Sequence, residues 1–230
     1  MVVLAITSLL SALLLPALSR SRSQAKRIQC LSNLRQLGIA AQLYWDDYEG
    51  RSFRFQRGAT NGGELYWFGW LQSGAEGNRL FDPSQGALFP YLGTQRIGNC
   101  SALNPFLPDF KRKASGSAFG YGYNLALSAP VSQPAINTQR IEKSAGTVLF
   151  GDAAQVNTFQ APASSTNPML EEFYYLNSSE PTAHFRHSNR ANVVFCDGHT
   201  GWENPVEGSF DSRLPAAKVG RIRGELLLVP

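Results

Sequence analysis

The chain contains 230 residues, of which 43% are hydrophobic, with 21 glycines and 13 prolines. This composition is typical of one globular domain with an appendage, and it excludes a disordered or collagen-like chain. The formal net charge is only +4, and the sequence has neither an aromatic RNA-binding motif nor a long basic run. We therefore expect no nucleic-acid partner.

The chain begins with an apolar stretch. Residues 1–18 carry no charge, and about 17 apolar residues are the lower limit for a membrane-spanning helix. A cleaved signal peptide would have basic residues before its apolar core, and few buried core helices start at residue 2 without a polar face. We favour a membrane helix over these two alternatives, and expect its proline to kink it near the membrane exit. Its residues include Leu4, Leu10, Leu14 and Pro16.

Residues 19–48 are expected to continue this helix in an amphipathic form. No proline interrupts them, and apolar residues recur at alternating steps of three and four, as on one face of a helix. Gly50 is a suitable stop, so a helix from Val2 to Glu49 would be about 70 Å long. The stripe expected to pack on the rest of the protein includes Leu34, Leu37, Ala41 and Tyr44.

From Arg51 onward the sequence predicts strands and loops. The segments LYWFGWL (65–71) and TVLFGDA (147–153) are rich in strand-forming residues, and GALFPYLG (86–93) is a compact segment bounded by turns. We therefore expect an α+β fold, in which the helix of residues 1–50 packs on an antiparallel β-sheet domain of residues 51–230.

The aromatic residues of segment 65–71 have two interpretations. Tyr66, Trp67, Phe68 and Trp70 could form a platform on which a glycan stacks, or they could belong to the hydrophobic core. Aromatic residues at alternating positions are core residues more often than ligand contacts, so we favour the core.

The clearest local element is a hairpin near the C-terminus. Asp197 and Gly198 are expected to form a two-residue type I′ turn, because such a turn needs positive φ at both positions and Asp-Gly adopts it easily. The two strands would run from Asn192 to Cys196 and from His199 to Glu203.

His187 precedes this hairpin, and three roles are open for it. In the structural role, its ring hydrogen-bonds the Asp197 carboxylate or the turn, so that His187, Asp197 and Gly198 clamp the preceding loop to the hairpin. In the second, a metal ion is held by ligands drawn from His184, His187, Asp197 and His199, with Asp152 added by the fold. Catalysis is the third. We favour the clamp and expect no metal or other cofactor, because the histidine spacing fixes no ligand pair on one face.

The three cysteines, Cys30, Cys100 and Cys196, allow limited inference. Cys30 lies in the helix stripe and is most simply a small apolar packing residue. Cys100 and Cys196 either form a disulfide or remain two free thiols, since spacing alone does not show whether they are close.

Several of these segments together resemble a known family. The run ALLLPALSRSRSQAKRIQCLSNLRQLGIAAQLYWDDYEG (12–50) resembles the N-terminal helix of bacterial type IV pilin-like proteins, the pseudopilins. The resemblance continues through GALFPYLG, GYGYN (120–124) and TVLFGDA. It ends in His187, nine residues and Asp197-Gly198, the spacing of the family's C-terminal H-X9-DG domain.

The resemblance implies a membrane-inserted subunit of a type II secretion or type IV pilus-like assembly. It places the chain in the inner membrane with a single span, a periplasmic C-terminal domain, and other pilin-like copies as partners of the helix. Family precursors begin with a basic leader, a cleavage site and a glutamate, which would lie upstream of Met1, so we expect the true start to be further upstream.

Two function classes remain open. The first is a non-enzymatic filament subunit, which we favour because no nucleophile with a paired base can be identified. The second is a membrane-anchored periplasmic binding or metal-binding domain that does not polymerise.

Overall fold

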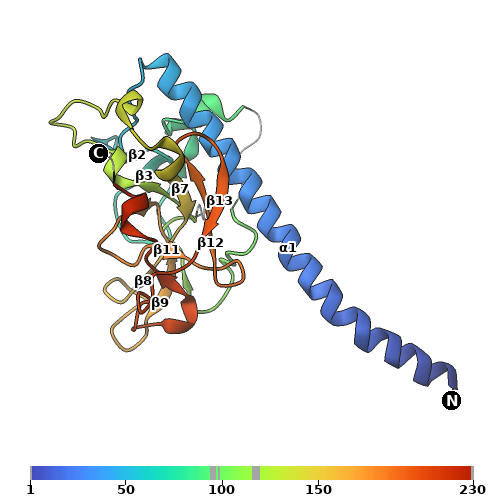
Figure 1. Cartoon of the computed structure of the whole chain (residues 1–230). Helices are drawn as coiled ribbons and strands as arrows, with labels where there is room; N and C mark the ends of the chain where they lie inside the picture. Colours follow the sequence, from blue (N-terminus) through green and yellow to red (C-terminus); the bar gives the residue numbers. More distant parts are fainter. Residues whose placement is uncertain (1, 94–96, 98, 116–119, 229–230) are drawn as a thin grey trace.

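The computed structural model describes residues 2–93, 97, 99–115 and 120–228, with the side chains of residues 2–13 left out. A single helix, α1 (Val2–Asp47, 46 residues), runs through Pro16 without interruption. Its C-terminal half lies along the β-rich part of the protein, and its N-terminal half projects away from it (Figure 1). The fold is therefore α+β, with one long helix packed on sheets.

Within the described part of the chain, the strands following α1 are short and form four sheets. A four-stranded sheet contains β1 (Gln56–Thr60), β2 (Gly63–Tyr66), β3 (Gly69–Gln72) and β4 (Phe81–Asp82). A five-stranded sheet has the order β10 (Tyr175–Leu176), β6 (Tyr121–Asn124), β7 (Val148–Asp152), β12 (Ala191–Phe195) and β13 (Thr200–Glu203). The smaller sheets are β5 (Phe110–Lys111), β9 (Met169–Glu172) and β8 (Ala154–Asn157), and β11 (Ala183–His184) with β14 (Val219–Gly220).

Short 3-10 helices lie between these strands and after the last one. They span Pro83–Gln85, Phe89–Tyr91, Leu125–Leu127, Thr138–Arg140, Ser144–Gly146, Pro215–Ala217 and Gly224–Leu226. The strand pairs are mostly antiparallel, as predicted, but β10 pairs with β6 and β5 pairs with β9 in parallel. The expectation of a purely antiparallel sheet is therefore wrong at these two pairs, which join segments far apart in the sequence.

Helix α1 packs on the five-stranded sheet, mainly against β12, with β7 and β13 beside it. Leu34, Leu37 and Ala41 of the predicted stripe are fully buried, and Tyr44 is partly buried against the same core. Gly38 lets the helix lie close to β12, because a Cβ at this position would be only 2.8 Å from Cγ2 of Val194 on that strand. A helix residue without a side chain thus lets the helix backbone lie close to the central strand.

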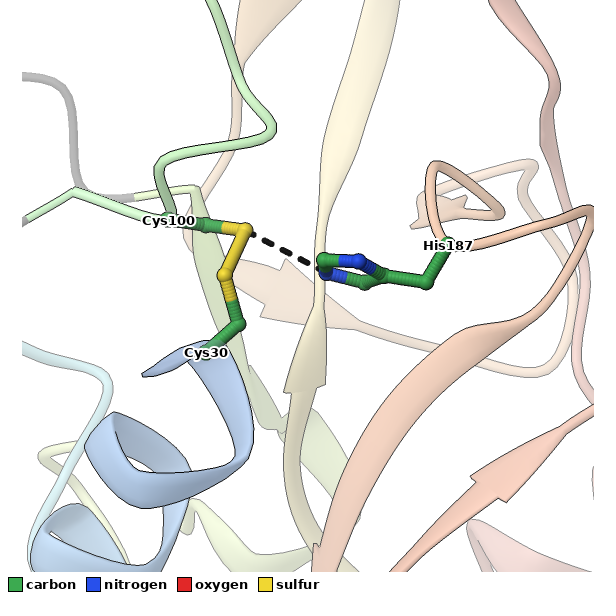
Figure 2. A group of neighbouring side chains, drawn as sticks. All are labelled: Cys30, Cys100 and His187. Atoms are coloured by element: carbon green, nitrogen blue, oxygen red, sulfur yellow. Dashed lines mark hydrogen bonds between the residues drawn. A yellow bond between two sulfur atoms is a disulfide. The ribbon is translucent and has the colours of Figure 1, made fainter. Parts of the chain in front are cut away.

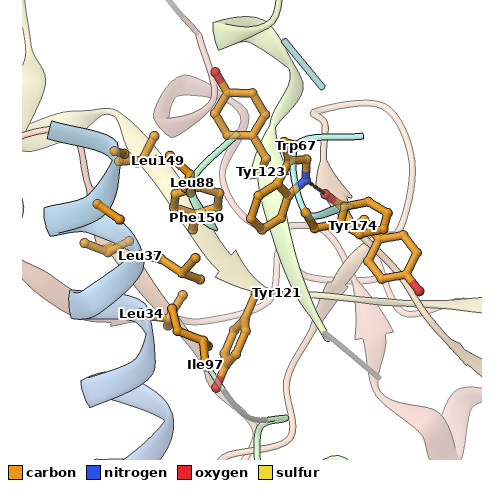
Figure 3. Close-up of a cluster of buried hydrophobic side chains, with 14 of the residues drawn as sticks. Leu34, Leu37, Trp67, Leu88, Ile97, Tyr121, Tyr123, Leu149, Phe150 and Tyr174 are labelled. Carbon is orange, nitrogen blue, oxygen red and sulfur yellow. Dashed lines mark hydrogen bonds between the residues drawn. The ribbon is translucent and has the colours of Figure 1, made fainter. Parts of the chain in front are cut away.

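The core between helix and sheet is strongly aromatic. Figure 3 shows Leu34 and Leu37 of α1 facing Tyr121 and Phe150 of the sheet, with Trp67 further from the helix. Trp67 is buried and its Nε1 donates a hydrogen bond to the Tyr174 carbonyl (3.0 Å). Burial of these large rings removes much apolar area from water and so stabilises the packing of the helix on the sheet.

The other aromatic residues of segment 65–71 also lie in or beside the core. Phe68 is buried and Tyr66 packs against the core, stacked on Phe68 with ring centroids 5.1 Å apart. Trp70 is half-buried and donates through Nε1 to the Thr60 carbonyl (2.8 Å). The four aromatic residues of this segment therefore lie in or beside the core, as favoured from the sequence, and do not form an exposed platform for a glycan.

Helix α1 ends two residues earlier than the sequence predicted. Its last turn closes with a hydrogen bond from Gly50 N to the Trp45 carbonyl (2.7 Å), and both Glu49 (φ 54°) and Gly50 (φ 76°) are left-handed. This is a Schellman-type ending, in which a residue with positive φ terminates the helix.

The predicted membrane helix is only partly described. Wherever the structure describes side chains, no helix is long and apolar enough to cross a membrane. Leu4 and Leu10 lie outside the described side chains, whereas Leu14 is 66% exposed.

Candidate functional site

The projecting half of α1 is the most unusual surface of the molecule. From Leu14 to Gln29 every side chain is exposed except Arg27, which is partly buried, and Cys30 is the first buried residue. Several large apolar side chains are exposed on this part: Leu14, Leu15, Leu18 and Ile28. An isolated helix gains little stability without packing partners, so a bare helix of this kind is a surface suited to other helices or lipid.

The helix is covalently attached to the sheet domain at the point where it leaves it. Cys30 of α1 and Cys100 of a loop form a disulfide with a Cα–Cα distance of 5.1 Å (Figure 2). The interpretation of Cys30 as a small packing residue is therefore wrong. Both alternatives for Cys100 are wrong too, because it neither pairs with Cys196 nor remains a free thiol. Cys196 is a free, buried thiol whose pKa burial raises to about 12.

Next to the disulfide lies a buried group of polar side chains. His187 Nε2 lies 3.3 Å from Cys100 Sγ and 3.4 Å from Asp152 Oδ2. Arg186 binds the same two partners, donating from Nη2 to Asp152 Oδ1 (2.6 Å) and from Nε to Cys100 Sγ (3.2 Å). The backbone N–H of Asn192 donates to Asp152 Oδ2 (2.8 Å), so the carboxylate connects β7 to the start of β12.

The electrostatics of this group follow from its burial. Burial raises the pKa of the Asp152 carboxyl to about 6, against the opposing effect of the Arg186 charge. Burial, and then the charge of Arg186, lower the pKa of His187 to about 3. At neutral pH the site therefore contains an ionised pair, Arg186 and Asp152, and an uncharged imidazole.

The H-X9-DG spacing matches the length of one strand with its two turns. His187 precedes β12, and Asp197 and Gly198 follow it, so the motif residues lie at opposite ends of that strand. The Asp197 carboxylate accepts hydrogen bonds from His199, one from its backbone N–H (3.1 Å) and one from its Nδ1 (2.6 Å). The predicted hydrogen bond between His187 and Asp197 is thus replaced by the contact of His187 with Asp152.

The turns at the two ends of β12 also differ from the prediction. The hairpin turn has three residues, Cys196 to Gly198, closed by a hydrogen bond from Gly198 N to the Phe195 carbonyl (2.9 Å). Only Gly198 has positive φ (88°), so this is not a type I′ turn but the three-residue kind with glycine in the left-handed position. The turn with two positive φ values is at the other end, where Ser188 (54°) and Asn189 (63°) precede the strand.

Both ends of β12 contact α1. At the start of the strand, His187 reaches the disulfide of Cys30, and at its end the Gly198 backbone lies against the Gln42 side chain. Five strand residues span about 17 Å, and the twelve-residue step from Cys30 to Gln42 rises about 18 Å. The strand is therefore about as long as the part of the helix between Cys30 and Gln42.

The candidate metal ligands named from the sequence do not come together. His184 is buried on β11 with Nδ1 3.0 Å from Arg186 Nη1, whereas His199 and Asp197 pair with each other on the surface. Among the described residues, the group able to hold a metal ion consists of Cys30, Cys100 and His187. Of the four candidates, only His187 belongs to it.

Arg186 is the member of this buried polar group that the sequence did not reveal. Besides Asp152 and Cys100, its guanidinium donates to the carbonyls of Gly120 (2.6 Å) and Ala153 (3.2 Å). A buried arginine needs a carboxylate partner, but the sequence contains no spacing that relates Arg186 to Asp152. The adjacent His187 was the only local signal.

A comparison of the chain with models of protein families, with curated proteins and with solved structures finds no match. The resemblance to pilin-like proteins therefore remains a prediction from the motifs quoted above.

Proposed function

We propose that this chain is a non-enzymatic pilin-like subunit of a type II secretion or type IV pilus-like assembly. The observation that carries the proposal is the projecting half of α1, which is continuous with the packed half and whose described side chains, from Leu14 to Gln29, are exposed apart from Arg27. In a filament, such helices would bundle with copies of themselves, and the sheet domains would form the outer surface.

The apolar sequence of residues 2–18 supports the same proposal. Together with the exposed leucines at positions 14, 15 and 18, it gives the projecting half an apolar surface suited to lipid before assembly and to neighbouring helices afterwards. A single span in the inner membrane, with the sheet domain in the periplasm, is the corresponding location. The Cys30–Cys100 disulfide supports that location, since disulfides persist in the bacterial periplasm.

The proposal is tested by placing a charge in the projecting half. Leu10→Arg introduces a charge that costs about 2.5 to 3.5 kcal/mol at the centre of a membrane span. We expect this variant to be lost from both the membrane fraction and sedimentable filaments, while thermal unfolding of the sheet domain stays unchanged.

Leu10→Ala is the matched control, because it shortens the same side chain without adding charge. It should retain both membrane association and assembly. Normal assembly of Leu10→Arg would contradict the proposal. Membrane association of the wild-type chain without any assembly would favour the alternative, an anchored domain that does not polymerise.

A further inference from the structure

Three ligand atoms converge at the point where α1 leaves the sheet domain. The sulfurs of Cys30 and Cys100 and a ring nitrogen of His187 all lie within 4.8 Å of one another, and all three residues are buried. They come from three separate segments, namely α1, the loop before β5 and the turn before β12 (Figure 2). Asp152 Oδ2 lies 3.4 Å from His187 Nε2, but the Asp152 carboxylate is not part of this group of mutually close ligand atoms.

Two thiolates and one imidazole are donors that Zn²⁺ binds in tetrahedral sites, in which water can take the fourth position. In such a site with Zn–S bonds of about 2.3 Å, the two sulfurs would be about 3.8 Å apart. The Cα atoms of the two cysteines are 5.1 Å apart, so the backbone already holds both sulfurs next to each other. Binding would therefore require the sulfurs to separate, while the helix and the loop keep their places.

The charges of the cluster would balance around a divalent ion. Two thiolates and the Asp152 carboxylate carry three negative charges, whereas Zn²⁺ and the Arg186 guanidinium carry three positive charges. Buried charges are tolerated when they are paired and hydrogen-bonded, and Arg186 already contacts both Asp152 and Cys100 Sγ. Arg186 would thus orient Cys100 from outside the metal's coordination sphere, and the Asp152 carboxylate would balance charge from the same outer position.

We propose that the dithiol form of this protein binds one Zn²⁺ through Cys30, Cys100 and His187, with water in the fourth position. The newly synthesised chain carries thiols, so no reductant is needed to reach this form. Binding breaks two S–H bonds, releases two protons to solvent and forms two Zn–S bonds, without transfer of electrons. The zinc form and the disulfide form exclude each other, because both use the same two sulfurs, and each ties α1 to the sheet domain.

The experiment measures zinc directly, so its outcome does not depend on whether the chain forms filaments. The full chain is reduced with a phosphine in mild detergent under anaerobic conditions, incubated with Zn²⁺ alone, passed through a desalting column and analysed for metal. We expect about one zinc per chain in the reduced protein and none in the oxidised protein. With Co²⁺ in place of zinc, we expect the intense visible bands of a tetrahedral ion and a thiolate charge-transfer band.

The variants are compared with wild type, all in the reduced state. Because loss of an outer-sphere partner weakens metal binding about 10- to 100-fold, we expect a loss of at least about 100-fold for Cys30→Ser, Cys100→Ser and His187→Ala. Cys196→Ala and His199→Ala are matched controls, since neither residue belongs to the cluster, and both should bind zinc as wild type does.

Protection of the wild-type thiols gives a measurement that needs no variant. Bound zinc should slow alkylation of Cys30 and Cys100, read by mass spectrometry after digestion, and leave Cys196 unaffected. Reduced wild-type protein that retains no zinc would overturn the proposal. So would zinc binding that persists in His187→Ala or that His199→Ala abolishes.

Discussion

At the scale of single residues, the Cys30–Cys100 disulfide fixes the helix to the sheet domain. It closes a loop of 70 residues, and a loop of that size stabilises the folded state by about 4 kcal/mol in the chain-entropy model. We expect Cys100→Ala to lower the free energy of unfolding by about 2 to 4 kcal/mol, measured by urea denaturation of the oxidised protein.

Cys196→Ala is the control for this prediction, because Cys196 is also buried but is not bonded to another cysteine. The Cys196→Ala variant should lose less free energy of unfolding, about 1 kcal/mol, as expected for removal of one small apolar group. Addition of a reductant should lower the stability of wild type and of Cys196→Ala, but not that of Cys100→Ala. Equal losses for the two variants would show that the disulfide contributes little.

The buried pair of Arg186 and Asp152 is the second point at the residue scale. Asp152→Asn would leave the guanidinium buried without its counter-charge, and breaking a buried pair in this way costs about 3 to 5 kcal/mol. Asp197→Asn, on the exposed hairpin, should cost less than about 1 kcal/mol. Thermal or urea unfolding of both variants checks this order, and a similar effect of the two would contradict the assignment of Asp152 as the partner of Arg186.

These residues also show why the sequence predicted the site only in part. The H-X9-DG spacing identified His187 and the Asp197-Gly198 turn, because a strand between two turns has a local signature. The true partner of His187 is Asp152, which lies one strand away in the sheet and far away in the sequence. Likewise three cysteines allow three pairings, and only the packing of α1 on the sheet selects Cys30 with Cys100.

At the scale of secondary-structure elements, the contact of α1 with β12 depends on Gly38. Gly38→Ala would place a methyl group within 2.8 Å of Val194 Cγ2, a buried branched side chain with little freedom to move. Overpacking costs about 1 to 3 kcal/mol, which exceeds the gain of about 0.5 to 1 kcal/mol from replacing a helix glycine. We therefore expect a net loss in the free energy of unfolding.

A double-mutant cycle separates this contact from other effects. Val194→Ala removes the clashing methyl groups, so Gly38→Ala should be neutral or stabilising in that background. Additive effects in the urea denaturation of the double variant would show that the two residues do not restrict each other.

The helix stripe was predictable because its periodicity is local, whereas Gly38 was not singled out. Leu34, Leu37 and Ala41 recur at the spacing of one helix face, and that face is buried against the sheet. The order of the strands was not predictable, since β6, β7 and β12 are neighbours in the sheet but far apart in the chain. Long loops separate them, and no hairpin signal connects them.

At the scale of the whole molecule, α1 divides into a packed half and a projecting half at Cys30. Up to that residue the described side chains of the helix are almost all exposed, and beyond it one face is buried on β12. The disulfide and the polar group of His187, Asp152 and Arg186 lie at this boundary. A force on the projecting half would therefore reach the sheet domain through a covalent bond rather than through packing alone.

The central claim is that the projecting half of α1 contacts other copies of the chain. Single cysteines at Ser19 and Ser23 sample one face of the exposed helix, and one at Ser21 samples the opposite face. Ser178→Cys places a thiol on the exposed surface of the sheet domain. The native cysteines interfere little, because two are bonded and Cys196 is buried.

Oxidative cross-linking of these variants in intact membranes is the most direct measurement. We predict covalent dimers for at least one of the three helix positions and none for Ser178→Cys. Absence of dimers at all three helix positions, under conditions in which each thiol reacts with a small maleimide, would contradict the account of this helix as an assembly element.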